Sequence, residues 1–513
     1  MASRILGLVR DQVLASFFGA SATIAMDAYY VAFRIPNLLR DLFAEGAMSA
    51  AFVPTFTSYL TTRGKNEALR VGNNVVNALI VIVGVLVILG LVFTDPLVRL
   101  LANEAYTSNP EKMALTISLA RIMLPSLLFI ALAAALMGML NSLHHYFIPA
   151  LSPAMFNVMT ILSAFALVPV LAQLGVAPIT AIAIGTTLGG IAQLALQWPT
   201  LYREGFRYRP TVDWRDEGLR RVLLLMGPGT IGMAATQVNL VVNNQLATGE
   251  GQGAVSWLNY AFRLMYLPIG LFGVSIATAT LPAVSRQAAE KNLTAVRDTI
   301  TRSISLMLML NVPATIGLVV LAVPIVRVIF EHGRFSGYDT LATATALQYY
   351  SIGLVGYSIV RIASPVFYAL GRNRVPVVVS VIAVLVNAGL NYALVRVMGY
   401  AGLAFGTSIA ALFNATVLFT LLRASIGGLN GRRLASSATR IGLASIAMGA
   451  AAVAADRYLA TAIAARGLAW EIFRLGATIV VAIGVLAAAA WALRIREFNE
   501  SVDMMLRRFR RRR

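Results

Sequence analysis

The sequence predicts an all-α protein that crosses a membrane many times, and three observations support that fold class. First, 58% of the 513 residues are hydrophobic and only 12% are charged, whereas a soluble chain of this length needs a more polar surface. Second, the apolar runs are about 20 residues long, as a membrane-spanning helix requires, while barrel strands would alternate over about ten residues. Third, the segments between the runs are too short to form a soluble catalytic domain.

The composition also excludes several kinds of chemistry. The chain has no cysteine, so disulfide and thiol chemistry are excluded, and its three histidines do not form an HExxH-type zinc motif. No GxxxxGK[ST] loop is present, so the chain is not an ATP-driven pump on its own. A membrane-embedded glycan enzyme would need carboxylates at an aqueous loop, where only scattered ones occur. We therefore expect a transporter rather than an enzyme, with a transport-dead scaffold as the remaining structural alternative.

Fourteen apolar segments can be distinguished, and an even number places both termini on the same side of the membrane. The predicted segments are 4–19, 28–59, 74–94, 115–140, 147–172, 176–198, 219–246, 253–284, 303–330, 340–369, 375–396, 401–422, 439–460 and 473–494. The loops and tail on the terminal side carry roughly three times as many lysines and arginines as the opposite loops, which predicts cytoplasmic termini. This bias also explains the net charge of +20 without nucleic-acid binding.

The first segment, Arg4–Gly19, is short for a membrane span. Its 16 or so residues make a helix of roughly 24 Å, against about 30 Å of hydrocarbon. It leaves no room for a signal peptide in front of it. Either this helix is tilted and faces a cavity, or the chain as given starts within a longer N-terminal segment.

Charged residues occur inside the first two segments, where each costs roughly 3 kcal/mol at the bilayer centre. Several together are more typical of a water-filled cavity than of lipid contact, although a structural ion-pair network is the alternative. A further arginine lies in the eighth segment. The candidate cavity residues are Arg4, Arg10, Asp11, Asp27, Arg34, Arg40, Asp41, Glu45 and Arg263.

Helical geometry predicts which of these residues share a face. At 100° per residue, Arg34, Asp41 and Glu45 fall within about 40° of one another, and Arg40 points about 120° away. In the first segment Arg4 and the acid after Arg10 share a face in the same way. Arginine is in slight excess, and its forked donors suit a bidentate anion such as phosphate.

A weak internal repeat spans the chain, with an offset of about 225 residues. Ala32-Phe33-Arg34 recurs as Ala261-Phe262-Arg263, and Pro54 corresponds to Pro282. The offset covers six segments, so the two halves have the same membrane orientation. We therefore predict two six-helix lobes, at 1–200 and 201–424, followed by two appended helices at 425–496 and a basic tail at 497–513. Transporters with two such lobes bind substrate at the interface and rock.

Two further groups of polar residues invite a binding role. Asn387 and Asn391 are four residues apart, with Thr407 on the next helix; their oxygens could coordinate Na⁺ or hydrogen-bond the helices. No carboxylate accompanies them, which favours hydrogen bonding. The basic tail beside the membrane predicts contact with anionic lipids.

The N-terminal segments SRILGLVRDQVLASFFGA and DAYYVAFRIPNLLRDLFAEGAMSAAFVP closely resemble the opening of the MurJ (MviN) lipid II flippases. The segment YAFRLMYLPIGLFGVSIATATLP extends the resemblance, which covers essentially the whole chain. These flippases belong to the multidrug/oligosaccharidyl-lipid/polysaccharide exporter superfamily.

The resemblance implies a V-shaped, two-lobe transporter that acts as a monomer in the bacterial inner membrane. It would carry lipid II, the undecaprenyl-pyrophosphate-linked peptidoglycan precursor, to the outer leaflet. Helices in 425–496 would hold the polyprenyl tail, and Na⁺, protons or the membrane potential would drive the cycle without another cofactor. A flippase for another polyprenyl-linked oligosaccharide, or a multidrug exporter, is the alternative. The family's substrate-binding residues correspond to Arg4, Arg10, Arg40, Arg263, Asp11, Asp27 and Glu45, and the repeat adds Arg34.

The chain also departs from the family pattern. Asp41 stands where members often have a second basic residue, and Phe262 where an acid is common. Asn391 takes the place of a carboxylate that some members have at the cation site. Members usually have a dozen or more residues before the equivalent of Ser3, which favours a longer N-terminal segment.

Overall fold

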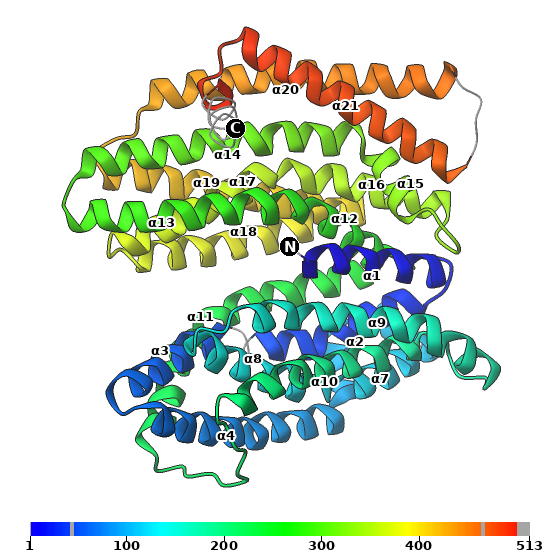
Figure 1. The fold of residues 1–513 in the computed structure, drawn as a ribbon. Coiled ribbons are helices and arrows are strands. Elements are labelled where there is room, and N and C mark those ends of the chain that lie inside the picture. Colours follow the sequence, from blue (N-terminus) through cyan, green and yellow to red (C-terminus); the bar gives the residue numbers. More distant parts are fainter. Residues whose placement is uncertain (1, 42–45, 463–466, 500–513) are drawn as a thin grey trace, which may run out of the picture. The chain divides into compact units, whose positions relative to one another are not determined.

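The computed structural model describes residues 2–41, 46–462 and 467–499, and every regular element in these ranges is a helix (Figure 1). The chain divides into two compact units. Unit 1 comprises Met1–Ser256 and His332–Ser336, and unit 2 comprises Trp257–Glu331 and Gly337–Arg513. The all-helical fold class predicted from the sequence is confirmed for the described residues.

Unit 1 contains the first eleven α-helices and the first turn of the twelfth. They are α1 (Ala2–Phe18), α2 (Ala25–Arg40), α3 (Gly46–Thr62), α4 (Lys65–Val92), α5 (Thr94–Leu101), α6 (Glu104–Thr107), α7 (Pro110–Met123), α8 (Ser126–Ser142), α9 (Phe147–Gln173), α10 (Thr180–Arg203) and α11 (Glu217–Thr248). Helix α9 packs along both α10 and α1, and α2 packs on α7.

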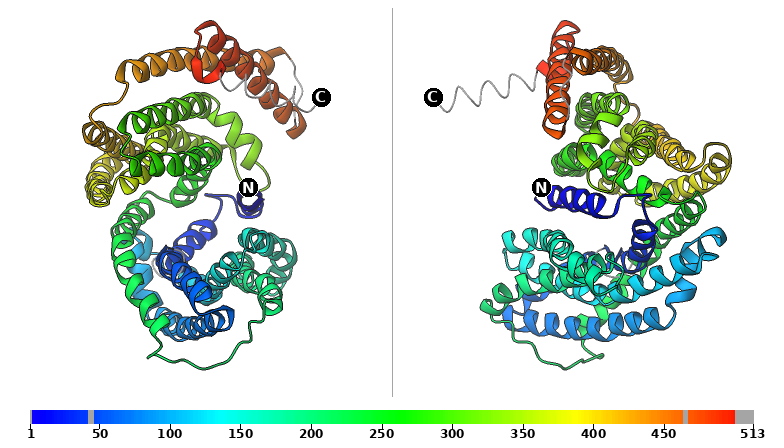
Figure 2. Two further views of the ribbon diagram at one scale, coloured as in Figure 1. Left: turned by 60° about the vertical axis from the view of Figure 1, so that its left-hand side comes forward. Right: turned by 90° about the vertical axis from the view of Figure 1, so that its right-hand side faces the viewer.

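Unit 2 contains the remaining helices. They are α12 (Ala254–Pro268, from Trp257 onward), the π-helix η2 (Ile269–Gly273), α13 (Val274–Ala289), α14 (Leu293–Val320), α15 (Ala322–Phe330), α16 (Gly337–Ile352), α17 (Leu354–Ala369), α18 (Arg374–Met398), α19 (Tyr400–Ser425), α20 (Gly431–Ala462) and α21 (Leu468–Ala492). Helices α20 and α21 run side by side and remain so in both views of Figure 2.

The membrane-spanning character follows from helix length and composition. Within the described ranges, nine helical stretches are long and apolar enough to cross a bilayer. A tenth is obtained if α16 and α17, which meet at a 41° bend, form one span. A helical protein with many spans is thus confirmed, while the number fourteen stays a prediction.

Two of the predicted segments each form two helices. Segment 28–59 forms α2 and α3 on either side of residues 42–45, which lie outside the described residues. Segment 253–284 forms α12 and α13 with the π-helix between them. Helix α2 ends at Arg40 and α12 ends at Pro268, so the two ends are 268 − 40 = 228 residues apart. These helix ends therefore recur at the spacing of the sequence repeat.

The core of unit 1 lies among α3, α4, α8, α10 and α11. Phe52 and Phe56 of α3 are fully buried and pack with Leu79 of α4, Met139 of α8 and Leu201 of α10. Because lipid tails are as apolar as these side chains, close van der Waals packing rather than removal from water holds such membrane helices together.

The core of unit 2 is divided into one main cluster and two smaller ones. Ile300, Phe367 and Leu418 bring α14, α17 and α19 together in the main cluster. Met309 of α14 and Ile441 of α20 belong to one of the smaller clusters, and the other contains Leu475 of α21. The two smaller clusters join α20 and α21 to the rest of the unit.

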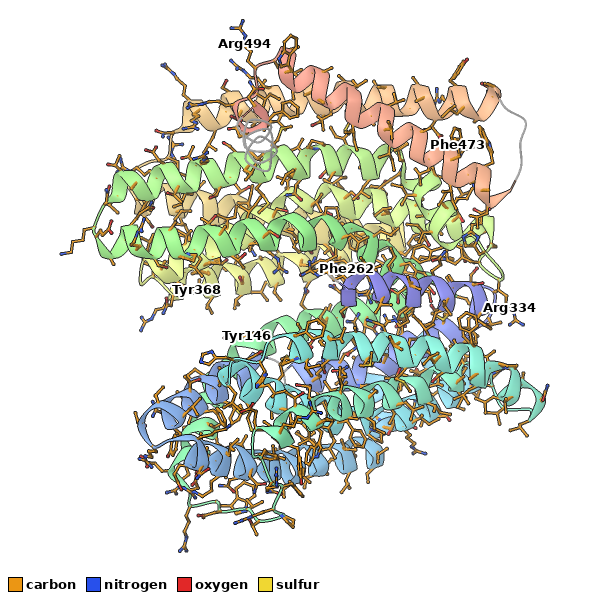
Figure 3. All side chains as sticks on the ribbon, in the orientation of Figure 1. Tyr146, Phe262, Arg334, Tyr368, Phe473 and Arg494 are labelled. Atoms are coloured by element: carbon orange, nitrogen blue, oxygen red, sulfur yellow. The ribbon has the colours of Figure 1, made fainter. Side chains whose placement is uncertain are left out.

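The end of α1 is held by the loop His332–Ser336. The backbone N–H of Arg334, labelled in Figure 3, donates to the carbonyl of Ser16 at 2.9 Å. Gly19 has φ +70°, and a Cβ added there would lie 2.6 Å from the carbonyl oxygen of Arg334. Only glycine fits this position without strain.

Candidate functional site

Helix α1 carries a buried ion pair. Both Nε and Nη2 of Arg10 donate to Oδ1 of Asp11, at 3.0 and 2.7 Å. The two residues are only 6% and 2% exposed, and the guanidinium lies 5.7 Å from the centre of the Phe156 ring. Each charge is compensated at close range, as burial in a low-dielectric environment requires.

The end of α2 carries a second pair with the same geometry. Nε and Nη2 of Arg40 donate to Oδ1 of Asp41, at 3.2 and 3.0 Å. Here the side chains are 27% and 29% exposed. Arg40 also lies in the last turn of α2, where a cation interacts favourably with the helix dipole. This guanidinium is accessible to a solute in a way that the buried one is not.

Both carboxylates bond the arginine next to them in sequence. The angular prediction grouped Asp41 with Arg34 and set Arg40 on another face. An arginine side chain is long enough to reach around the helix, so the angle between Cβ positions does not decide the partner. Arg34 is partly buried and Arg4 is exposed. Glu45, the remaining acid predicted from this region, lies outside the described residues.

Asp27 is buried, at 1% exposure, and both of its oxygens are occupied by protein donors. Oδ2 accepts from the backbone N–H of Gly253 at 2.7 Å, and Oδ1 from the hydroxyl of Ser256 at 2.7 Å. The Nζ of Lys112 lies 3.5 Å from Oδ2. A carboxylate at the first turn of α12 compensates the positive end of that helix.

Lys112 was not predicted as part of this group, because hydropathy placed it in a loop. It lies inside α7, whose start is set by Asn109, which accepts from the Lys112 N–H at 3.0 Å, and by Pro110. The ammonium lies 4.4 Å from the centre of the Tyr106 ring. An Asn-Pro pair before an apolar periodic stretch is a helix-start signal, and it would have placed this lysine in the helix.

An apolar cavity of about 270 Å³ lies beside α2 in unit 1. Ile35, Leu38 and Leu39 line it from α2, together with apolar residues of α4, α5 and α11. Leu39 directly precedes Arg40, so an apolar cavity adjoins the partly exposed ion pair along the same helix.

Arg263 belongs to α12 in unit 2 and is exposed. Its neighbour Phe262, labelled in Figure 3, stacks on Tyr266 with ring centres 5.8 Å apart and meets Tyr350 edge-on at 5.5 Å. An aromatic cluster thus occupies the helix face beside this arginine, one to two turns before the π-helix. Irregular π segments inside α-helices are frequent at functional sites.

The three predicted cation ligands lie together in unit 2. The amide of Asn391 donates to Asn387 Oδ1 at 3.3 Å, and the amide of Asn387 donates to the Thr407 hydroxyl at 3.4 Å. Both asparagines are buried. No group of three or more acidic or histidine side chains suited to a metal ion occurs in the described part of the chain. This chain of hydrogen bonds joins α18 to α19, as the residue types favour.

Comparison with known proteins supplies the context for this geometry. The profile of the family "Lipid II flippase MurJ" matches residues 14–471. The probable lipid II flippase MurJ of Vibrio cholerae is 35% identical over 423 residues, covering 81% of this chain and 79% of that protein. The lipid II flippase MurJ of Burkholderia cenocepacia is 33% identical over 425 residues, covering 82% and 81%.

Solved structures agree with these sequences. The inward closed conformation of a lipid II flippase MurJ matches with a TM-score of 0.76 and 28% identity, over 96% of this chain and 97% of that one. An inward-facing MATE multidrug transporter matches with a TM-score of 0.68 and 17% identity, over 83% and 94%. The MATE likeness concerns the fold alone.

Proposed function

The chain belongs to the lipid II flippase MurJ family, and we propose from this premise that it flips lipid II across the bacterial inner membrane. The cargo would be the undecaprenyl-pyrophosphate-linked peptidoglycan precursor, carried to the outer leaflet for cell wall synthesis. Identity of 33–35% to the curated flippases over about four fifths of the chain is the observation that carries the proposal.

The chemistry of the charged residues supports this cargo. A pyrophosphate is an anion that forked guanidinium donors bind well. Arg40 is partly exposed at the end of α2, and Arg4 and Arg263 are exposed. Arg10 is buried against Asp11, so we propose that it acts mainly by fixing α1. A cationic drug would be repelled by such a set, which argues against the multidrug exporter.

The finer architecture is part of the proposal. We propose fourteen spans, with lobes at 1–200 and 201–424 that rock around the substrate, and two helices at 425–496 that hold the polyprenyl tail. Both termini would be cytoplasmic, because lysine and arginine are concentrated in the loops on that side. The chain would work as a monomer.

The residues that could couple transport to an ion gradient are neutral. Asn387, Asn391 and Thr407 supply neutral oxygens that Na⁺ accepts, but their mutual hydrogen bonds also serve as a link between helices. We therefore place the coupling with the membrane potential or protons ahead of Na⁺. Rescue assays with and without sodium distinguish these sources.

The test is complementation of a bacterial strain depleted of its own lipid II flippase. We expect the wild-type chain to restore growth, and Arg263→Ala and Arg40→Ala to fail although the protein inserts at normal levels. Arg396→Ala serves as a matched control, because Arg396 is exposed at the end of α18 and hydrogen-bonds Tyr392 of the same helix. Full rescue by both Arg263→Ala and Arg40→Ala would overturn the headgroup assignment. Absence of rescue by the wild-type chain would overturn the cargo.

A further inference from the structure

A polar cavity of about 140 Å³ opens between the start of α20 and the residues that follow α21. We call it the arginine pocket. Its volume is roughly that of five water molecules in the liquid, enough for one phosphate group. Its charged and hydroxyl-bearing lining residues include Arg433, Ser437, Arg440, Arg494, Arg496 and Glu497.

One wall of the arginine pocket is a single face of α20. Arg433, Ser437 and Arg440 are spaced by four and three residues and therefore lie above one another. Nη1 of Arg440 donates to the carbonyl of Leu493 at 3.2 Å, and the hydroxyl of Ser437 donates to Oε1 of Glu497 at 3.0 Å. These bonds fix the two walls to each other, so the pocket is a built feature of unit 2.

The other wall contains a residue in an unfavourable backbone conformation. Arg494 follows the end of α21 with φ +51°, in the left-handed region. The N–H of Ile495 bonds back to the carbonyl of Ala490 at 2.9 Å, which closes a helix end where glycine is the usual residue. A non-glycine residue in this conformation is unfavourable and points to a functional reason for its side chain. Figure 3 labels Arg494 beyond the end of α21.

The charges of the arginine pocket are unbalanced. Four guanidinium groups face one carboxylate, that of Glu497. The side chains of Arg433 and Arg494 form no hydrogen bond or ion pair with any residue in the described ranges. Clustered like charges repel one another, so this set of lining residues attracts an anion.

The surroundings place the arginine pocket at a membrane surface. Trp491, one turn before Arg494, is 73% exposed, and tryptophan is enriched where hydrocarbon meets the headgroups. Beneath the pocket, Ile495 and Ile441 are buried in an apolar cluster with Ala490 and Met309. An anion bound here therefore lies at headgroup depth, with apolar helix faces along the side that its chains would follow.

We propose that the arginine pocket binds the phosphate of an anionic phospholipid and so attaches the ends of α20 and α21 to the lipid surface. Guanidinium groups bind phosphate with two parallel hydrogen bonds, and basic pockets between membrane helices are suited to acidic headgroups. Its lining residues belong to unit 2, whereas the charged residues of α1 and α2 belong to unit 1.

The test uses the purified full chain in an uncharged detergent, with bound lipid counted by native mass spectrometry. The probes are dioctanoyl phosphatidylglycerol, dioctanoyl phosphatidylcholine and inorganic pyrophosphate. We expect the double variant Arg433→Gln, Arg494→Gln to bind phosphatidylglycerol at least about tenfold more weakly, since two charged hydrogen-bond donors are lost. Phosphatidylcholine should bind weakly to every variant, and pyrophosphate binding should be the same for the wild type and the double variant.

The control variant removes the same number of positive charges as the test variant but leaves the arginine pocket intact. Arg423→Gln with Arg432→Gln removes two exposed arginines near the same end of unit 2, and we expect less than a twofold effect. Equal weakening by both double variants would overturn the proposal, because it would indicate a diffuse charge effect. Pyrophosphate binding that is weakened by the double variant as much as phosphatidylglycerol binding would overturn the lipid assignment.

A single variant separates binding from folding. Arg494→Gly relieves the left-handed backbone while removing the guanidinium. We expect its thermal unfolding midpoint to be no lower than that of the wild type, with phosphatidylglycerol binding reduced several-fold. Undiminished lipid binding by this variant would contradict the proposal.

Discussion

The pairs Arg10–Asp11 and Arg40–Asp41 use the same residues in the same order and the same three atoms, yet their environments differ. Arg10 and Asp11 are almost completely buried in α1, whereas the side chains of Arg40 and Asp41 are more than a quarter exposed at the end of α2. Removing one partner of a buried ion pair is strongly destabilising, whereas an exposed ion pair contributes little to the free energy of unfolding. The same dipeptide is therefore structural in one helix and available for binding in the other.

The largest expected effect is that of Arg10→Ala. Asp11 would be left buried without its cation, and breaking such a pair costs about 3–5 kcal/mol. We expect a matching loss in the free energy of unfolding in detergent, together with failure to rescue a flippase-depleted strain. A loss below about 1 kcal/mol would contradict the structural role of the buried pair.

The control for this change is the double variant Arg10→Met, Asp11→Leu. Replacing a buried ion pair by apolar residues of similar volume is often neutral or stabilising. We expect stability close to that of the wild type. Rescue by the double variant would then mean that Arg10 has no direct role in transport.

Arg40→Ala should have little effect on stability but a large effect on rescue of growth. The partly exposed pair contributes at most about 1 kcal/mol, so the free energy of unfolding should change little. Rescue should nevertheless fail, and Arg40→Lys should restore it only in part, because lysine lacks the fork that binds phosphate bidentately. Destabilisation as large as that of Arg10→Ala would remove the contrast between the pairs.

The two acids provide a matched pair of conservative changes. Asp11→Asn leaves the buried Arg10 without its counter-ion, and we expect a cost of about 3 kcal/mol. Asp41→Asn should cost less than about 1 kcal/mol and should not impair rescue, because Arg40 keeps its charge. Chemical denaturation of both variants in one detergent checks the difference, and equal costs would contradict it.

The smallest effect concerns an ion pair outside the membrane spans. Lys65 and His145 both bond Glu204, at 2.6 and 2.7 Å, and these hydrogen bonds, that of Lys65 first, hold the pKa of Glu204 below its ordinary value. Its stabilising contribution is present above the unfolded-state pKa, and it is lost as the pH falls through the lowered pKa. Thermal midpoints of the wild type and Glu204→Gln should differ slightly at neutral pH and converge at low pH. A constant difference would exclude this linkage.

The sequence predicted the helical fold and the charged helices because both depend on local information. Runs of apolar residues define spans, and a charge within such a run is visible wherever its side chain points. The repeat was also visible, since Arg34 and Arg263 keep their local context. The break between α12 and α13 was not visible in the sequence, because nothing in the local composition near Ile269 distinguishes a π-helix from an α-helix.

Partner choice could not be predicted in the same way. The angle between residues around the helix predicted that Asp41 would lie with Arg34, but Asp41 accepts hydrogen bonds from Arg40. The arginine side chain is long enough to reach around the helix, so the angle between the two positions does not decide the partner. Lys112 reaches Asp27 only after α2 and α7 have packed together. The arginine pocket likewise combines residues about 60 positions apart in sequence, at the two ends of a helical pair.

The π-helix Ile269–Gly273 has a consequence for how the chain tolerates a change of length. A π turn corresponds to one residue inserted into an α-helix, and one residue turns a helix by about 100°. Deletion of one residue here would let α12 and α13 continue as one regular helix. It would also turn away the face of α13 that packs on α14 and α17, so this span does not accept a deletion that a surface loop would.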